Sequence, residues 1–188
     1  MKMTEQIAEP IEFQLPSGYR SARALGIFER AGPTELQLTD FFWLPLQAIA
    51  KQFAADLHGG VVPFARSGDG DVFGWSYDDV NTVFFAPVDS EPVFYAADFE
   101  AFLYRVLLEE FSMSALVARL GIDATAARFR RYAEQIGSLL PTTWAKVLRD
   151  LSRRPLEPTG IGFYSVLSRD EADRLIFQAA QAAGRNDL

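Results

Sequence analysis

Apolar residues alternate with small or polar ones in a central stretch, Val61 to Tyr77, on both sides of a short polar segment. Phe73, Trp75 and Tyr77 recur at every second position, which is the period of a strand with one apolar face. Gly, Asp and Ser fill residues 67–71 and favour a turn, because they tolerate left-handed backbone angles or make local hydrogen bonds. The stretch therefore predicts a β-hairpin.

Two further short runs of β-favouring residues follow the hairpin, at residues 82–86 and 93–95. An earlier segment, Glu35 to Leu44, starts with apolar residues at alternate positions and predicts another strand. Strands this short, joined by tight turns, are typical of a largely antiparallel sheet.

Two helices are predicted before the hairpin. The first begins at Leu15, with a proline in its first turn, and runs to about Ala31. The second follows Pro45 and places apolar residues at helical spacing as far as Leu57, before a Gly-Gly pair ends it.

Helical periodicity is clearest after Asp98, a favourable N-cap residue. The apolar residues that follow form one broad stripe: Phe99, Phe102, Leu103, Val106, Leu107 and Phe111. We expect this helix to pack on the sheet face that carries Phe73, Trp75 and Tyr77.

After Phe111 the pattern becomes purely helical. Successive apolar stripes comprise Met113, Leu116, Val117 and Leu120, then Phe129, Tyr132, Ala133, Ile136 and Leu140, then Trp144, Val147, Leu148 and Leu151. Asp123 is expected to cap the second of these helices. Ser168 and Glu171 form a capping box that opens a final helix, after a loop at residues 155–162.

The predicted elements divide the chain at residue 111. Residues 1–111 hold the sheet and the helices against it, and residues 112–188 form an all-helical extension that packs on this part. The length of 188 residues suits one domain with such an extension. The expected fold class is α+β.

Composition is that of an ordinary globular protein, with 49% hydrophobic and 23% charged residues. No apolar run reaches the roughly 20 residues of a membrane helix, and the N-terminus lacks the apolar core of a secretion signal. The chain has no Cys, which excludes disulfides, thiolate metal sites and Cys nucleophiles. We therefore expect a cytoplasmic protein without a membrane segment.

Charge is spread unevenly along the chain, whose formal net charge is −7. Residues 1–100 carry 6 Lys or Arg and 15 Asp or Glu, a net charge of −9, whereas the remaining residues carry 12 and 10, a net charge of +2. An acidic front half disfavours nucleic-acid binding, which needs a cationic surface. It suits a basic protein partner, although solubility alone also accounts for it.

Four carboxylates near the hairpin, Asp69, Asp71, Asp78 and Asp79, are candidates for a cation site or for a patch that binds a basic partner. Their spacing falls short of a calcium loop, which would continue to further oxygen ligands and a Glu. The alternative is two polar β-turns. An enzyme would need a convergent carboxylate pair, such as Asp69 with Asp78 or Asp79, in a pocket.

His58 is the only histidine, so a Ser-His-Asp triad would have to use it. No Gly-x-Ser-x-Gly motif is present, and a cation at a helix C-terminus is the better interpretation of His58. One His without Cys also argues against a zinc site, since zinc needs several ligands. We expect no metal and no cofactor.

Trp75 and Tyr77 are candidate binding anchors, because aromatic residues dominate interface hot spots. Packing in the core against the helix after Asp98 is the alternative. Two basic clusters in the helical part comprise Arg128, Arg130 and Arg131, and Arg149, Arg153 and Arg154. We interpret them as solvated helix faces or as groups that dock on the acidic half.

Eight motifs lie along residues 10–111: Leu15-Pro16-x-x-Tyr19, Gly32, Leu44-Pro45-Leu46, Val62-Pro63-Phe64-Ala65, Gly68-Asp69-Gly70-Asp71, Phe73-Gly74-Trp75, Val83-Phe84 and Phe99-x-x-Phe102-Leu103. Together they resemble the SUKH superfamily, which groups a yeast cell-wall-synthesis regulator with many bacterial immunity proteins. The first helix departs from the family's pattern at Arg23 and Gly26, and residues 112–188 lie outside the resemblance.

The resemblance implies a twisted, mostly antiparallel sheet packed against helices, and a binding role rather than catalysis. Bacterial members commonly neutralise a cognate toxin, often a nuclease or deaminase, by binding it directly. The function implied is that of an immunity protein with a basic toxin domain as partner. The alternative is a standalone regulatory or scaffold protein of the same fold that binds another protein.

Overall fold

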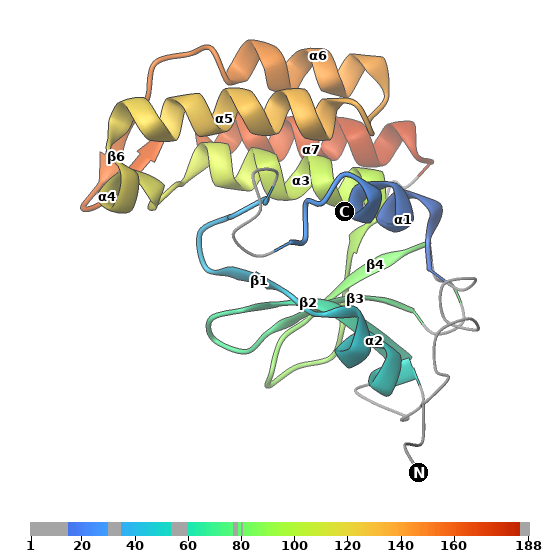
Figure 1. The fold of residues 1–188 in the computed structure, drawn as a ribbon. Coiled ribbons are helices and arrows are strands. Elements are labelled where there is room, and N and C mark those ends of the chain that lie inside the picture. Colours follow the sequence, from blue (N-terminus) through green and yellow to red (C-terminus); the bar gives the residue numbers. More distant parts are fainter. Residues whose placement is uncertain (1–14, 30–34, 54–59, 77–78, 80, 185–188) are drawn as a thin grey trace.

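The computed structural model describes residues 15–29, 35–53, 60–76, 79 and 81–184 (Figure 1). Its helices are α1 (Ser17–Ala24), α2 (Leu46–Phe53), α3 (Phe99–Ser112), α4 (Leu116–Leu120), α5 (Ile122–Gly137), α6 (Thr142–Leu151) and α7 (Arg169–Ala182). Its strands are β1 (Phe41–Trp43), β2 (Val61–Ser67), β3 (Val72–Ser76), β4 (Val83–Ala86), β5 (Val93–Ala96), β6 (Glu157–Gly160) and β7 (Phe163–Ser165). The α+β fold class is confirmed. None of the described helices is long and apolar enough to cross a membrane.

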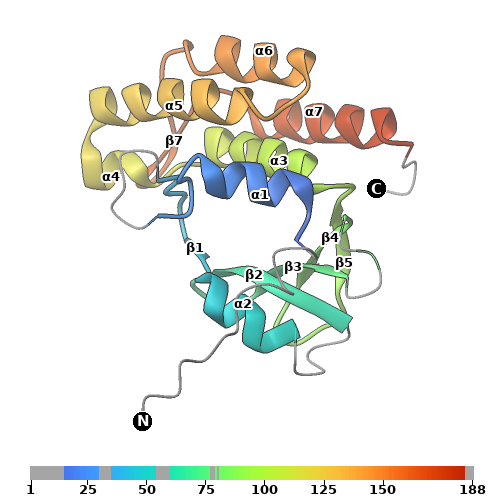
Figure 2. The same cartoon turned by 45° about the vertical axis from the view of Figure 1, so that its right-hand side comes forward.

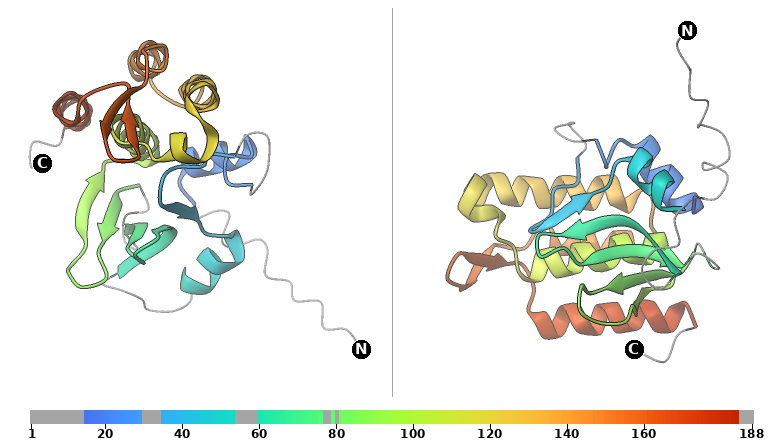
Figure 3. Two further views of the ribbon diagram at one scale, coloured as in Figure 1. Left: turned by 90° about the vertical axis from the view of Figure 1, so that its left-hand side faces the viewer. Right: turned by 90° about the horizontal axis from the view of Figure 1, so that it is seen from below.

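The main sheet is a five-stranded antiparallel meander in the order β1-β2-β3-β4-β5 (Figure 3). Its centre depends on Gly74, which pairs with Pro63 on one side and Phe84 on the other. A Cβ atom at Gly74 would lie 2.4 Å from the carbonyl oxygen of Val62, so this close approach of β2 and β3 requires glycine.

The predicted hairpin and the two strands after it are confirmed as β2, β3, β4 and β5. The strand predicted from Glu35 to Leu44 is wrong in extent, because only β1 (Phe41–Trp43) pairs with β2. Leu36 and Leu38 are buried nevertheless. The carbonyl oxygen of Leu36 accepts a hydrogen bond from the indole N–H of Trp43 at 3.0 Å. The alternation reflected alternate burial of an extended segment, not membership of the sheet.

Helix ends differ from the predicted ends in the first part of the chain. α1 ends at Ala24 rather than Ala31, because Gly26 takes a left-handed conformation with φ 73°. The second helix is present as α2, and the rest of its predicted length, to Leu57, lies outside the described residues.

Of the predicted helix caps in the C-terminal part, the Asp123 cap is wrong, and of the Ser168–Glu171 capping box only the Ser168 half is found. Asp123 lies inside the first turn of α5, whose N-cap is Gly121. Ser168 does cap α7, accepting a hydrogen bond from the backbone N–H of Glu171 at 3.2 Å. The Glu171 carboxylate pairs with Arg154 at 2.9 Å.

The C-terminal part is not purely helical, because β6 and β7 form a two-stranded antiparallel sheet. Tyr164 in β7 also pairs with Ser114 through two backbone hydrogen bonds of 2.9 and 3.0 Å. This hairpin replaces the loop predicted at residues 155–162. All four residues of β6 are exposed, so the segment lacks the apolar alternation that reveals a strand.

α3 lies between two layers, with the sheet on one side and α5, α6 and α7 on the other (Figure 2). It is buried on both sides, since residues on its sheet side, such as Phe102, and on its helix side, such as Leu108, have no exposed surface. The core continues across residue 111. Phe111 stacks on Phe129 of α5 with ring centroids 4.3 Å apart.

An aromatic layer fills the space between the sheet and helices α1 and α3. It comprises Tyr19, Phe28, Phe41, Trp43, Phe64, Phe73, Trp75, Phe85, Tyr95, Phe99 and Phe102. The Phe102 ring lies within 6.1 Å, between centroids, of rings from β1, β2, β3 and β5. The predicted packing of this helix on the sheet is confirmed for Phe73, and Tyr77 lies outside the described residues.

A polar junction, formed by Gln37, Thr39, Glu110, Ser114 and Tyr132, joins the segment before β1 to the helical layer. The Tyr132 hydroxyl donates to the carbonyl of Gln37 at 2.6 Å and accepts from its N–H at 2.9 Å. The Glu110 carboxylate accepts from the N–H and hydroxyl of Thr39, at 2.5 and 2.9 Å, and from the hydroxyl of Ser114. Burial raises the pKa of Glu110, and these hydrogen bonds oppose the rise.

Candidate binding surface

The predicted site residues that the structure describes lie in turns or in the core. Asp69 is exposed in the turn between β2 and β3. Asp71 ends that turn half-buried and accepts hydrogen bonds from the hydroxyl of Ser67 at 3.3 Å and the N–H of Val88 at 3.2 Å. Asp78 lies outside the described residues.

Asp79 belongs to the turn before β4. Its carboxylate accepts from the Thr82 hydroxyl at 2.7 Å and from the N–H of Asn81 at 3.0 Å. The Thr82 bond, with the Asn81 bond, lowers the pKa of Asp79. These contacts are those of a polar turn, as the alternative interpretation held.

The predicted carboxylates do not gather into one site. Asp69 and Asp71 lie at one end of β3 and Asp79 at the other. β3 has five residues, about 17 Å of extended chain. The carboxylate pair that an enzyme would need from Asp69 and Asp79 is therefore absent, which corrects that hypothesis.

Trp75 is a core residue rather than a surface anchor. Its exposed fraction is 0%, and its ring stacks on Phe64 at 4.9 Å and meets Tyr19 edge-on at 5.3 Å. β3 is the central strand, and α1 and α3 cover the face on which Trp75 lies. The assignment of Trp75 to partner binding is therefore wrong.

Tertiary structure gathers other carboxylates instead, at the end of the sheet where β2 turns into β3 and β4 into β5. We call this the acidic end, formed by Asp40, Asp69, Asp71, Asp89 and Glu91. The Val88–Asp71 hydrogen bond joins its two turns. Asp40 lies against Gly68, since a Cβ atom there would be 2.0 Å from the Asp40 carboxylate.

Four of the five carboxylates of the acidic end face solvent. Asp40, Asp69, Asp89 and Glu91 are exposed. Within the part of the chain that the structure describes, none of them forms an ion pair. The ion pairs found there, Arg105–Glu109 and Arg154–Glu171, lie in helices α3, α6 and α7 or beside them. Such carboxylates attract a cationic surface.

Sequence reasoning missed Asp40, Asp89 and Glu91, although a signal was present. In an antiparallel meander, alternate turns lie at the same end of the sheet. The predicted strands already placed the turn at residues 67–71 and the loop at residues 87–92 at one end. Only the position of Asp40 required the structure, because it depends on where β1 pairs.

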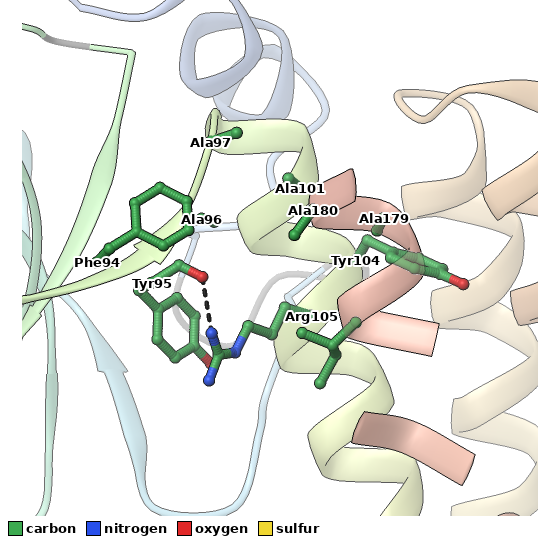
Figure 4. A pocket seen from close by; sticks show the side chains of 10 residues that line it. Phe94, Tyr95, Ala96, Ala97, Ala101, Tyr104, Arg105, Ala179 and Ala180 are labelled. Atoms are coloured by element: carbon green, nitrogen blue, oxygen red, sulfur yellow. Dashed lines mark hydrogen bonds between the residues drawn. The ribbon is translucent and has the colours of Figure 1, made fainter. Parts of the chain in front are cut away.

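Figure 4 shows a small hollow between β5, α3 and α7. Its volume is about 20 Å³, enough for roughly one water molecule. The Arg105 guanidinium donates to the carbonyl of Tyr95 at 2.8 Å, lies 3.9 Å over the Tyr95 ring and pairs with Glu109. Burial, together with the Glu109 charge, raises the pKa of Tyr95. This cluster fastens β5 to α3 and has no room for a substrate.

A wider, open hollow of about 660 Å³ lies where α1, α3 and α6 begin. Helix N-termini favour anions, but the carboxylates of Asp98 and Glu100 line this hollow. Asp98 is already the N-cap of α3, accepting from the N–H of Ala101 at 2.7 Å. Burial raises the pKa of Glu100, and the charge of Asp98 adds to the rise. The positive helix N-termini and the negative carboxylates offset each other, so the hollow favours neither an anion nor a cation.

The basic clusters of the helical part divide between internal contacts and solvent. Arg128 donates to the side-chain oxygen of Gln37 at 2.6 Å, and Arg154 pairs with Glu171. Arg130, Arg149 and Arg153 are exposed. This arrangement agrees with solvated helix faces and with docking on the N-terminal part through Arg128.

His58 lies outside the described residues. Among the residues that are described, no three His, Asp or Glu side chains gather in a way that could hold a metal ion. No family model, no curated protein and no solved structure matches this chain.

Proposed function

We propose that this chain is a non-catalytic protein-binding module of the SUKH type that acts in the cytoplasm as an immunity protein. It neutralises a cognate bacterial toxin by binding it directly, and the toxin domain it binds is basic. The module makes and breaks no covalent bond in its partner and needs no cofactor.

The observation that carries this proposal is the acidic end of the sheet. Four of its carboxylates are exposed and form no ion pair with a described residue. Between residues 60 and 97 the chain has six Asp or Glu and only one basic residue, Arg66. Exposed, unpaired charge of one sign speeds association with a partner of the opposite sign and selects against others.

The resemblance of residues 10–111 to the SUKH superfamily favours a toxin as the partner, because bacterial members of that superfamily commonly neutralise one. The alternative is a standalone regulatory or scaffold protein of the same fold. It is favoured if the genes beside this one encode neither a toxin nor secretion machinery. Both share the acidic end, so the identity of the bound protein decides between them.

The test is a pull-down from the source organism with the tagged chain, analysed by mass spectrometry at low and moderate salt. We expect one basic toxin domain to be recovered, and its recovery to fall as salt rises, because salt screens exposed charges. Recovery of regulatory proteins supports the alternative, and no reproducible partner overturns both.

A matched pair of variants locates the binding surface. Asp69→Lys/Glu91→Lys reverses charge at the acidic end, and Glu134→Lys/Asp173→Lys makes the same change of net charge on exposed positions of α5 and α7. We expect the first variant to lose the partner and the second to retain it. Equal losses would show that only net charge matters.

A further inference from the structure

The main sheet has two edge strands, β1 and β5, and the described residues cover only the edge of β5. At β5, Arg105 donates to the outward-facing carbonyl of Tyr95 at 2.8 Å, and α7 lies alongside (Figure 4). Covering a sheet edge with a helix and its side chains is a common device against pairing with another chain. The β5 edge is therefore blocked.

The β1 edge has no such cover among the described residues. The N–H of Leu44 donates to the carbonyl of Phe64 in β2 at 2.9 Å, and Phe42 pairs with Arg66. Leu44 and Phe42 therefore direct their backbone groups toward β2, so Phe41 and Trp43 direct theirs away from it. No described residue forms a hydrogen bond with these outward groups of Phe41 and Trp43.

Among the described residues, an open hollow lies beside this edge. Its volume is about 310 Å³, and it is lined by β1, by the segment that precedes β1, and by Phe28 and Arg119. Phe42 is 57% exposed and lies on the sheet face opposite to Phe41 and Trp43. A strand added along β1 would place alternate side chains in the hollow and against Phe42.

We propose that the edge of β1 is the docking site for an extended, basic segment of the partner, which adds to the sheet as a further strand. This inference rests on the proposed function and names the mode of binding. Figure 3 shows β1 at the margin of the sheet, where such a segment would lie.

The carboxylates near β1 favour a basic segment as the added strand. Asp40 directly precedes β1, and Asp69 and the half-buried Asp71 belong to the turn beside it, next to Asp89 and Glu91 of the acidic end. The cations nearby are Arg119 in the hollow and Arg66 opposite Phe42. A second copy of the chain fits poorly, because pairing of two β1 strands would bring two acidic ends together in molecules of net charge −7 each.

The probe is a synthetic eight-residue peptide that alternates Lys and Val, compared with one that alternates Glu and Val. Phe42→Lys places a charge on the β1 edge. Val93→Lys is the matched control on the β5 edge, because Val93 is 52% exposed. We expect the Lys-Val peptide alone to bind, Phe42→Lys to weaken it about tenfold or more, and Val93→Lys to leave affinity within about twofold.

Amide hydrogen exchange in the wild-type chain gives a second readout. Strand addition slows exchange at Phe41 and Trp43, whose N–H groups gain acceptors, and leaves β5 unchanged. Equal weakening by the two lysine variants, binding without slower exchange at Phe41 and Trp43, or no binding of the Lys-Val peptide overturns the proposal.

The pull-down tests docking at β1 separately from the proposed function as an immunity protein. A toxin recovered equally by wild type and Phe42→Lys overturns docking at β1 and leaves the proposed function standing. Peptide binding at β1 without any recovered protein partner overturns the proposed function alone.

Discussion

The aromatic layer and the polar junction both hold α3 in place, but by different physics. The aromatic layer joins α3 to the sheet through ring contacts, with Phe102 within 6.1 Å of rings on four strands. The polar junction joins the helical layer to the segment before β1 through hydrogen bonds between groups 71 and 95 residues apart. Apolar contacts are non-directional and insensitive to pH, whereas the junction depends on the protonation of Glu110.

The difference shows which part of the fold is stable regardless of pH and which part depends on hydrogen bonds and on the charge of Glu110. Dispersion and burial in the aromatic layer are shared among many rings, so its energy is large and collective. In the junction, each lost partner leaves a buried polar group unsatisfied, which costs about 1–3 kcal/mol. Substitutions in the two regions should therefore differ in how much they lower the unfolding free energy and in how that loss depends on pH.

The largest effect is expected from Phe102→Asp. Truncation of a buried Phe to Ala alone costs about 3–5 kcal/mol, and Asp adds the cost of a buried charge. Because total stability is about 5–15 kcal/mol, we expect this variant not to fold, as measured by circular dichroism and chemical denaturation. Phe177→Asp, at a position 41% exposed on α7, should fold. A folded Phe102→Asp chain would show that the aromatic layer does not hold the sheet to α3.

A smaller effect is expected from Tyr132→Phe in the polar junction. The variant keeps the ring but leaves the N–H and carbonyl of Gln37 without their partner, so unfolding free energy should fall by about 1–3 kcal/mol. Tyr104→Phe is the control, because the Tyr104 ring is buried in the same way while no described residue forms a hydrogen bond with its hydroxyl. Urea denaturation should place Tyr104→Phe within about 0.5 kcal/mol of wild type. Equal losses would assign the effect of Tyr132 to ring packing.

Glu110→Gln is expected to change the unfolding free energy least at any single pH. It is also expected to change most clearly how that free energy depends on pH. Burial raises the folded-state pKa of Glu110 above its ordinary value of 4.5. The folded protein therefore holds this proton more tightly than the unfolded chain. The stability contributed is fully present below about pH 4.5 and is lost as pH rises through the folded pKa.

Urea denaturation of both proteins across this pH range is the measurement. The unfolding free energy of wild type should fall with rising pH relative to that of Glu110→Gln, which has no proton to lose at this position. Glu100, whose pKa is also raised, is present in both proteins and cancels in the difference. Parallel pH profiles would mean that Glu110 keeps the same charge folded and unfolded.

Much of the fold could be predicted from periodicity because the signal is local. The hairpin of β2 and β3, the later strands and the stripe of α3 each follow from the residues of one segment. Errors arose where a segment's environment overrode its pattern. Leu36 and Leu38 alternate but are buried outside the sheet, and β6 is exposed at every position and so shows no alternation.

The candidate surface was predictable only in part. Asp69 and Asp71 were identified as turn carboxylates and lie at the acidic end. Trp75 was proposed as an anchor because aromatic residues favour interfaces, but only the position of β3 at the centre of the sheet could place it in the core. Composition does not say whether a strand is central or at an edge.

The sequence by itself determined the elements, the α+β class and the acidic character of the front half, because each is a property of neighbouring residues or of their sum. Only the tertiary structure decided that Asp40 joins the turn carboxylates, that Arg105 covers the β5 edge while no described residue covers the β1 edge, and that Glu110 is buried. These features depend on contacts between distant segments, which form only when burial of the shared core brings those segments together.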